Sequence, residues 1–293
     1  MSIKLIINPA AGRGKASKLS VKVIKEFEER GADFEYEYST NPRHAVDISR
    51  EASTKFQKVI ALGGDGTVNE VGEGLVGSDA IFGVIPLGSG NDFANEIGIP
   101  AKISDAVDII LSDKVHLIDV IKVNDRISLN TAGVGFNGTV SEVVKSIKYL
   151  KGMSVYIWGV VKTALRYQSI PLKISLNGRL VEEKIFMISI CNSKSEGGGF
   201  IVAPDAKNND GLFDVTIIRH ISYMKLLLNL NKALTGNLNK LKEVETIKGE
   251  SIIIESEFPM PVHVDGEVIT LNAHKVEASI LKSALKVVGN SAQ

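Results

Sequence analysis

The sequence predicts an α/β domain built on a parallel sheet, followed by a region that is mostly antiparallel β. Short apolar runs alternate with helix-like patterns four times in roughly the first hundred residues, which is typical of strands and helices wound into a parallel sheet. Glycine-rich loops follow three of these runs. From Val115 onward, strand patterns and hairpin turns dominate instead, so we expect a domain boundary near residues 124–130.

The four expected strands of the first region cover residues 4–7, 34–38, 59–62 and 82–85. Each is a short run of apolar or alternating residues that ends at a turn-forming sequence. Helices are expected between and after them, because apolar residues recur at the helical spacing. The residues that mark these helix faces are Leu19, Val23, Phe27, Ala45, Ile48, Ala52, Phe56, Val71, Leu75, Ile103, Val107 and Ile110.

Three loops of this region have the composition of a phosphate-binding site. Residues 8–15 follow the first strand, residues 62–70 the third and residues 86–94 the fourth. Glycines allow a backbone to approach a ligand closely, and the N-terminus of a following helix attracts phosphate. The carboxyl ends of parallel strands lie at one edge of the sheet, so we expect the three loops to converge. The carboxylate of Asp65 suggests a metal ion beside the phosphate.

These loops do not match two common nucleotide motifs. The first loop has Pro9 where a Walker A motif has its first glycine, and Ala16 where that motif has Ser or Thr. A G-x-G-x-x-G match at residues 72–77 lies at the end of an expected helix, so we reject it as a cofactor motif. A tight turn without a ligand remains the alternative for residues 63–66, and Thr67 and Asn69 can be read as helix caps.

The second region is predicted to contain strands with two helical interruptions. Asn124-Asp125 and Asn177-Gly178 indicate hairpin turns. An apolar stripe from Met153 to Leu165 and another from Tyr223 to Leu234 predict helices whose stripes face the core. For the first helix, exposed Trp158, Lys162 and Arg166 offer a second hypothesis, contact with a lipid interface. The expected strands are residues 116–123, 126–131, 172–176, 180–191, 213–218, 251–255 and 262–264.

The composition excludes several protein classes. The 293 residues include 34 Lys and Arg and 34 Asp and Glu, and this balance argues against a broad nucleic-acid surface. The single cysteine, Cys191, cannot form an internal disulfide. No apolar run is long enough for a transmembrane helix, and the first residues do not resemble a secretory signal. We therefore expect a soluble, cytoplasmic protein.

Five motifs, in this order, resemble the bacterial diacylglycerol kinase and lipid kinase family. They are Asn8-Pro9 with Gly12, the run from Gly63 to Glu70 (GGDGTVNE), residues 86–94 (PLGSGNDFA), residues 210–215 (DGLFDV) and residues 265–267 (DGE). The GGDGT sequence is shared with NAD kinases, whereas PLGSGNDFA together with the late DGE distinguishes the lipid kinases. The resemblance extends from about residue 3 to about residue 280.

The resemblance implies an α/β nucleotide domain over residues 1–127 that is similar to NAD kinase. It also implies a C-terminal antiparallel β-sandwich over residues 128–278, with ATP in the cleft between them. A C-terminal segment, residues 279–293, would pack back on the first domain. The positions that would contact ATP are Asn8, Pro9, Ala10, Ala11, Gly12, Thr40, Gly63, Gly64, Asp65, Gly66, Thr67, Val68, Asn69 and Ser89.

The same resemblance implies metal and catalytic roles. Asp65 would hold the Mg²⁺ that accompanies ATP, and Asp210 with the carbonyls of Lys207 and Leu212 would form a second, structural Mg²⁺ site. Glu267 matches the position of the proton acceptor, with Asp265 as the other carboxylate of the DGE motif. Phosphoryl transfer requires a phosphate cradle, a divalent metal and a carboxylate near the acceptor hydroxyl. Asp-Gly is also an ordinary turn dipeptide, so plain turns are the alternative at residues 210–211 and 265–266.

We therefore expect an ATP- and Mg²⁺-dependent kinase that phosphorylates a hydroxyl of a diacylglycerol-like lipid, with diacylglycerol to phosphatidic acid as the first choice. The expected partners are ATP and a lipid at the membrane surface. The protein would bind peripherally at the inner face of the membrane. Whether it forms a homodimer is left open. One alternative is a kinase for another acceptor, such as a sphingoid base or NAD. The other is a nucleotide- and lipid-binding protein without turnover.

Overall fold

The computed structural model of the protein describes residues 2–147 and 153–290, without the side chain of Met153. Its contacts divide the chain into two compact units. Unit 1 comprises Met1–Ile118 and Ser283–Gln293, and unit 2 comprises Asp119–Lys282. The domain boundaries expected from the sequence, after residues 127 and 278, stay a prediction.

Unit 1 is built on a parallel sheet whose strand order is β2-β1-β3-β4-β15. The four strands predicted in this region are confirmed, and the fifth position is taken by residues 286–287 of β15, which pair with β4. The central strand β3 is buried along its whole length, as expected for a strand covered on both faces. The bounds are β1 Ser2–Ile7, β2 Asp33–Tyr38, β3 Lys58–Gly63, β4 Ile81–Pro86 and β15 Glu267–Val288.

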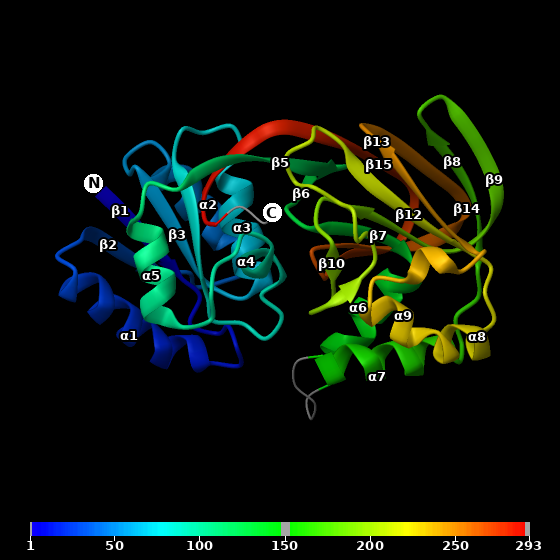
Figure 1. Cartoon of the computed structure of the whole chain (residues 1–293), viewed down its shortest axis with the longest axis horizontal. Helices are drawn as coiled ribbons and strands as arrows, with labels where there is room; N and C mark the ends of the chain where they lie inside the picture. Colours follow the sequence, from blue (N-terminus) through cyan, green and yellow to red (C-terminus); the bar gives the residue numbers. More distant parts are fainter. Residues whose placement is uncertain (1, 148–152, 291–293) are drawn as a thin grey trace. The chain divides into compact units, whose positions relative to one another are not determined.

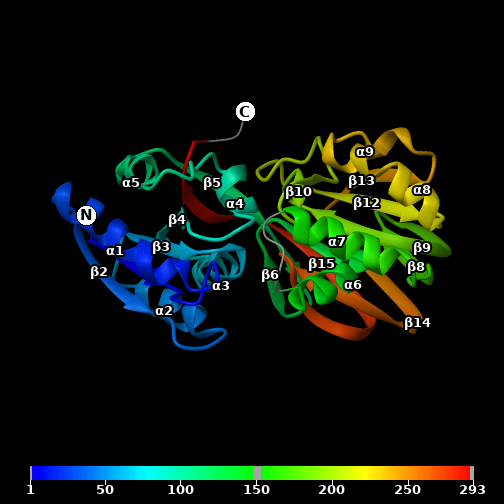
Figure 2. The ribbon, with the colours of Figure 1, turned by 90° about the horizontal axis from the view of Figure 1, so that it is seen from below.

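Helices cover both faces of this sheet (Figures 1 and 2). Helix α1 packs against α5, and α2 packs against α3. The strand order explains this arrangement, since right-handed crossovers place α1 on one face and place α2 and α3 on the other. The bounds are α1 Lys15–Glu29, α2 His44–Ala52, α3 Asp65–Leu75, α4 Asp92–Glu96 and α5 Ile103–Leu111.

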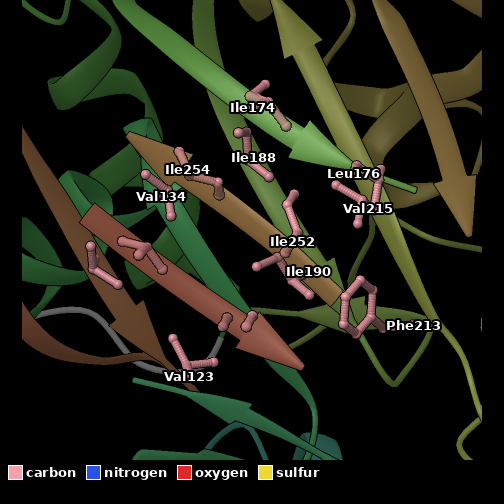
Figure 3. Close-up of a cluster of buried hydrophobic side chains, with 14 of the residues drawn as sticks. Val123, Val134, Ile174, Leu176, Ile188, Ile190, Phe213, Val215, Ile252 and Ile254 are labelled. Atoms are coloured by element: carbon pink, nitrogen blue, oxygen red, sulfur yellow. The ribbon is translucent and has the colours of Figure 1, made fainter. Parts of the chain in front are cut away.

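Unit 2 is an antiparallel sheet that folds over onto its own core. Strands β7 and β8 each pair with both β9 and β14, at different parts of these two long strands. The side chains enclosed in this way are mainly Ile, Val and Leu from β7, β8, β9, β12 and β14 (Figure 3). The bounds are β5 Val115–Val123, β6 Arg126–Ser128, β7 Thr131–Gly135, β8 Ile170–Leu176, β9 Arg179–Cys191, β10 Ser195–Glu196, β11 Phe200–Ile201, β12 Phe213–Arg219, β13 Val244–Gly249 and β14 Ser251–Val264.

The helices of unit 2 cover a second apolar cluster on the sheet. They are α6 Phe136–Lys145, α7 Met153–Ala164, α8 Tyr223–Leu228, α9 Leu230–Leu234 and a 3₁₀ turn, Leu238–Lys240. Val160 and Ala164 of α7 are buried in this cluster, with Ile157 partly buried beside them. The predicted core stripe of α7 is therefore confirmed at these positions, whereas Leu165 is 63% exposed because α7 ends at Ala164. Met153, also in that stripe, lies outside the described side chains.

Several expectations for unit 2 are wrong in detail. The predicted strand 126–131 is interrupted by a bend at residues 129–130, so that β6 ends at Ser128 and β7 begins at Thr131. The predicted strands 251–255 and 262–264 belong to one strand, β14. The single helix expected over residues 223–234 is two short helices, because Asn229 ends α8 and precedes α9. Helix α6 was not expected, since its β-branched residues have low helix propensity and packing against α7 stabilises it. Strands β13 and β15 and the short strands β10 and β11 were not expected either.

Both predicted hairpin turns are confirmed. Asn177 and Gly178 have φ angles of 53° and 74° between β8 and β9, and Asn124 has a φ of 49° between β5 and β6. Asparagine and glycine tolerate this left-handed conformation at low cost, which is why these turns can be recognised from the sequence.

Candidate active site

Asn8 joins the loop after β1 to the start of α3. Its backbone N–H donates to the carbonyl of Leu62 at 3.2 Å, and its side-chain Nδ2 donates to Thr67 Oγ1 at 3.0 Å. The Asn8 Oδ1 accepts the N–H of Ala10 at 3.0 Å, which fixes the loop that also contains Pro9 and Ala11. Asn8 therefore holds together two of the three loops that were expected to converge.

Glycines allow the loops after β1, β3 and β4 to meet backbone to backbone. A Cβ atom at Gly88 would lie 2.5 Å from the Cα atom of Gly64, and one at Gly12 would lie 2.6 Å from the carbonyl oxygen of Leu87. Both distances are far inside van der Waals contact, so a larger residue at either position would push the loops apart. The predicted convergence of the three loops is confirmed.

Asp65 links the loop after β3 to the loop after β4. Its Oδ2 accepts the backbone N–H of Asn91 at 2.8 Å. Asn91 has a φ of 58° and accepts the N–H of Gly88 on its own Oδ1 at 3.0 Å, while the N–H of Leu87 donates to the carbonyl of Gly63 at 2.7 Å. The carboxylate of Asp65 is thus positioned by the loops, and the residue as a whole is partly buried.

Helix α3 begins at Asp65, two residues earlier than expected. Its N-cap residue is Gly64, so the hypothesis that Thr67 and Asn69 cap the helix is wrong. Both lie inside α3 and are buried, as is Val68. Because Gly64 has no side chain that could bond the N–H groups of the first turn, this helix end suits a bound phosphate.

Thr40 and Ser89 occupy the remaining expected ATP positions. Ser89 is exposed in the same loop as Gly88 and Asn91. Thr40 is exposed after β2, and its N–H and hydroxyl lie 3.2 and 3.1 Å from His44 Nδ1. In the part of the chain that the structure describes, no hydrogen bond joins Thr40 to the three converging loops.

In unit 2, Asp265 and Gly266 form the two-residue turn between β14 and β15. Their φ angles are 46° and 80°, the conformation that Asp-Gly favours in tight hairpins. The Asp265 carboxylate accepts hydrogen bonds of 2.7–3.0 Å on both of its oxygens, and bonds of this charge-assisted kind are strong. Asp265 therefore anchors the turn to the segment between β6 and β7. The donors are the hydroxyl of Ser128 and the backbone N–H groups of Leu129, Asn130 and Thr131.

The other side of this turn is held by His263. Its Nδ1 accepts the N–H of Gly266 at 3.3 Å, and its side chain is buried. Burial lowers the pKa of His263 to about 4, so the imidazole is neutral at pH 7. A Cβ atom at Gly133 would lie 2.2 Å from His263 Nε2, which explains why only glycine fits at position 133.

Glu267 is the first residue of β15 and points its carboxylate at Arg126. Its Oε2 accepts a hydrogen bond from Arg126 Nη2 at 3.0 Å, and its side chain is 46% exposed. In contrast to the carboxylate of Asp265, the Glu267 carboxylate is therefore open to a solute.

The Asp210-Gly211 turn precedes β12. Asp210 Oδ1 accepts the N–H of Leu212 at 3.1 Å, and the N–H of Gly211 donates to Asp119 Oδ2 at 2.7 Å. Asp119 is 2% exposed and is the only carboxylate in β5, where it lies between apolar neighbours. The plain-turn hypothesis describes the backbone correctly here, but the buried carboxylate of Asp119 adds a specific tie to the turn.

Lys248 places a cation beside this turn. Its Nζ lies 2.9 Å from Asp210 Oδ2 and 2.9 Å from Asp214 Oδ2. Although burial opposes it, hydrogen bonding to Asp214 and Asp210 raises the pKa of Lys248, so the ammonium is charged at neutral pH. A metal at Asp210 would have to share this carboxylate with the lysine.

The donor sets differ in how well they suit Mg²⁺. In the described residues, no three His, Cys, Asp or Glu side chains gather into a metal site. Magnesium needs only one or two carboxylates when substrate phosphates supply further oxygens. Asp65 offers such a carboxylate beside a phosphate-type cradle, so its surroundings fit the ion. Asp210 fits less well, since Lys248 already neutralises it.

The whole chain is similar to known lipid kinases. Residues 2–123 match the model of the diacylglycerol kinase catalytic domain, and residues 130–289 match that of the YegS C-terminal NAD kinase beta sandwich-like domain. A probable lipid kinase YegS-like protein from Chromohalobacter salexigens is 33% identical over 233 residues, which are 76% of this chain and 73% of that protein. The chain belongs to the bacterial diacylglycerol kinase and YegS-like lipid kinase family.

Two further relatives of this lipid kinase family agree with the fold. A diacylglycerol kinase from Bacillus subtilis strain 168 is 29% identical over 269 residues, covering 90% of this chain and 89% of that protein. The crystal structure of a putative diacylglycerol kinase from Bacillus anthracis strain Sterne matches with a TM-score of 0.82 at 26% identity, covering 99% of this chain and 97% of that one. The predicted fold class, an α/β domain followed by a β-rich domain, is confirmed.

Sequence reasoning missed four residues that hold turns or the DGE carboxylates of this chain in place. Asp119 carried a signal, since a lone carboxylate between apolar residues of a strand is rarely buried without a partner. Arg126, Lys248 and His263 carried none, because their partners are identified only by the fold.

Proposed function

We propose that this chain transfers the γ-phosphoryl group of ATP to a hydroxyl of a diacylglycerol-like lipid. The observation that carries the proposal is the backbone-to-backbone contact of the three glycine loops beside Asp65. A phosphate cradle at the carboxyl edge of a parallel sheet is the site where such folds bind nucleotides. The DGE motif and the family relationship favour a lipid as the acceptor of the phosphoryl group.

Each part of unit 1 has a role in this proposal. The N-terminus of α3 and the backbone of residues 63–66 bind the phosphates, while Asn8 fixes the adjoining loop. Asp65 holds the Mg²⁺ that neutralises charge on the phosphates. In unit 2, a second Mg²⁺ at Asp210, with the carbonyls of Lys207 and Leu212, is proposed as a structural ion. We expect it to bind more weakly, because Lys248 shares the Asp210 carboxylate.

In unit 2, we assign the proton acceptor to Glu267 rather than to Asp265. The lipid hydroxyl gives its proton to Glu267 as its oxygen attacks the γ-phosphorus, and the bond from that phosphorus to the bridging oxygen of ADP breaks. Glu267 is exposed and can reach a solute, whereas both oxygens of Asp265 accept hydrogen bonds from residues 128–131. Asp265 therefore positions the turn that carries Glu267.

The acceptor is tested by incubating the protein with γ-labelled ATP, Mg²⁺ and a total bacterial lipid extract. We expect one labelled lipid that comigrates with phosphatidic acid, and stronger labelling when diacylglycerol is added. If added NAD or a sphingoid base is labelled instead, that molecule and not diacylglycerol is the acceptor. Binding of ATP and diacylglycerol without any labelled product would favour the alternative of a binding protein without turnover.

We also propose that the protein is peripheral at a membrane and contacts it through α7 and α8. No helix among the described residues is long and apolar enough to cross a bilayer. Helices α7 and α8 pack against each other (Figure 1) and carry large exposed apolar side chains with the cations Lys162 and Arg166 nearby, a combination typical of interfacial helices. The apolar side chains on and next to these helices are Trp158 (53% exposed), Leu165 (63%), Tyr223 (49%), Met224 (53%) and Leu228 (75%).

Replacing Trp158 with alanine should lower binding to anionic lipid vesicles at least about tenfold, because burial of a large apolar side chain is worth roughly 1.5–3 kcal/mol. Sedimentation with vesicles measures this. Tyr36→Ala serves as the control, since Tyr36 is an equally exposed aromatic residue (51%) on β2. Equal vesicle binding by the wild type and by Trp158→Ala would contradict the assignment of this face.

A further inference from the structure

The segment from β6 to the start of β7, residues 126–131, supports every carboxylate of the DGE turn. Ser128 and the N–H groups of residues 129–131 hold Asp265, and Arg126 holds Glu267. Asp265 thus has several donors, whereas in the described residues the carboxylate of Glu267 is bonded to Arg126 alone. The contrast matters because Glu267 is the residue with a long, exposed side chain.

Arg126 and Glu267 lie on backbone segments that are hydrogen-bonded to each other through β15. Arg126 follows directly after the turn between β5 and β6 and pairs with Val123. The turn residue Asn124 is fixed to β15 by two hydrogen bonds of 2.9 Å: its N–H donates to the carbonyl of Glu277, and its Oδ1 accepts the N–H of Glu277. Since β15 also carries Glu267, the guanidinium and the carboxylate are supported by the same strand.

The burial of the pair is uneven. The Arg126 side chain is 21% exposed and the Glu267 side chain 46%, so the arginine is the fixed partner and the glutamate the accessible one. A guanidinium presents its N–H groups in a planar fork and orients a carboxylate better than an ammonium can. A glutamate without such a partner loses the preference for one rotamer, because its side chain has considerable conformational entropy.

We infer that Arg126 is a positioning residue, which holds the Glu267 carboxylate in the orientation from which it accepts the proton of the lipid hydroxyl. This inference rests on the proposed function, since it requires Glu267 to be the proton acceptor. It assigns Arg126 no contact with ATP or lipid. Arg126 acts through Glu267, and its effect on the rate should vanish when Glu267 cannot accept a proton.

A double-mutant cycle on the full-length protein tests this. We measure kcat and the KM values for ATP and for diacylglycerol in mixed micelles, for Arg126→Gln, for Glu267→Gln and for the double variant. Arg126→Gln should lower kcat about tenfold, the scale expected when a long side chain regains rotamer freedom, with both KM values within twofold. In the Glu267→Gln background the same change should alter kcat by less than about twofold, since residues that act as a unit are not additive.

Arg126→Lys should recover part of the lost kcat, because the charge is kept and the fork is not. Arg179→Gln is the matched control. Arg179 lies in the same unit and makes an ion pair of 3.5 Å with Glu245 on the surface, so its replacement should leave kcat unchanged. A loss of folded protein in Arg126→Gln would lower kcat equally in both backgrounds, and the cycle separates that case from positioning.

The outcomes distinguish the inference from the proposed function. A tenfold loss for Arg126→Gln alone, together with a slow Glu267→Gln variant on which Arg126→Gln has no further effect, supports the inference. An unchanged kcat for Arg126→Gln alone overturns it. A slow Glu267→Gln variant that Arg126→Gln slows by another tenfold overturns the inference and leaves the proposed function intact. A wild-type rate for Glu267→Gln overturns the assignment of Glu267 as the proton acceptor. The positioning role of Arg126 is then overturned as well, because it depends on that assignment.

Discussion

Replacing Asp65 with alanine should abolish phosphoryl transfer while the protein still folds. Asp65 supplies the carboxylate that we assign to Mg²⁺, and the loss of that ion from a phosphoryl-transfer site removes several kcal/mol of transition-state stabilisation, or a factor of at least about 10³ in rate. The structural cost is small. The N–H of Asn91 loses its acceptor on Asp65, which should destabilise the fold by about 1 kcal/mol.

Asp65→Asn separates the two roles of this residue. The amide oxygen can still accept the N–H of Asn91, so stability should return, while activity should not, because a neutral amide binds Mg²⁺ poorly. Asp105→Asn is a matched control: Asp105 is also an acidic residue in the first turn of a unit 1 helix, α5, and pairs with Lys102 on the surface. Turnover by Asp65→Asn near the wild-type rate would show that this carboxylate does not serve the metal.

The first unit could be predicted from the sequence because its elements are local. Strands β1, β3 and β4 are largely apolar runs, since a parallel sheet is covered on both faces. Asn8-Pro9 follows β1, while β3 ends at Gly63 and β4 at Pro86. The converging loops could be predicted for the same reason. Their glycines are spaced within a few residues, and the parallel topology alone places them at one edge.

The second unit could be predicted less well because its strands are irregular. In β14 the register shifts between Glu255 and Met260 and again at Val262 and His263, so the alternation that marks a strand is interrupted. Two short strands were expected where one long strand exists. Helix α6 was missed because its stability comes from packing rather than from its own residues.

The hydrogen bonds that hold the DGE turn join residues far apart in the sequence, so no short sequence pattern predicts them. Ser128 and Asp265 are 137 positions apart in the sequence, and Arg126 and Glu267 are 141 apart. A pattern of a few residues can show that Asp265-Gly266 favours a turn. It cannot show that the carboxylate of Asp265 is hydrogen-bonded within the fold while that of Glu267 remains accessible.

That distinction leads to the second large effect, a loss of about 10²–10⁴ in kcat when Glu267 is replaced with glutamine, the usual contribution of a positioned general base. Glutamine keeps the shape of the side chain, and its amide oxygen can still accept a hydrogen bond from Arg126 Nη2. The ability to take a proton is the main property that is lost. The variant should therefore fold as the wild type does, and its KM for ATP should be unchanged, because the proposed ATP loops belong to unit 1.

The control for this variant is Glu277→Gln. Glu277 lies on the same strand, β15, and its carboxylate also has a cationic partner, Lys275, yet it has no proposed role in the reaction. Initial rates of lipid phosphorylation at saturating ATP compare the two variants. If both variants turn over at the wild-type rate, Glu267 is not the proton acceptor. Asp265, whose two oxygens already accept hydrogen bonds, could replace it only by giving up the bonds that hold the turn. The acceptor hydroxyl would then have to lose its proton directly to the γ-phosphate oxygens.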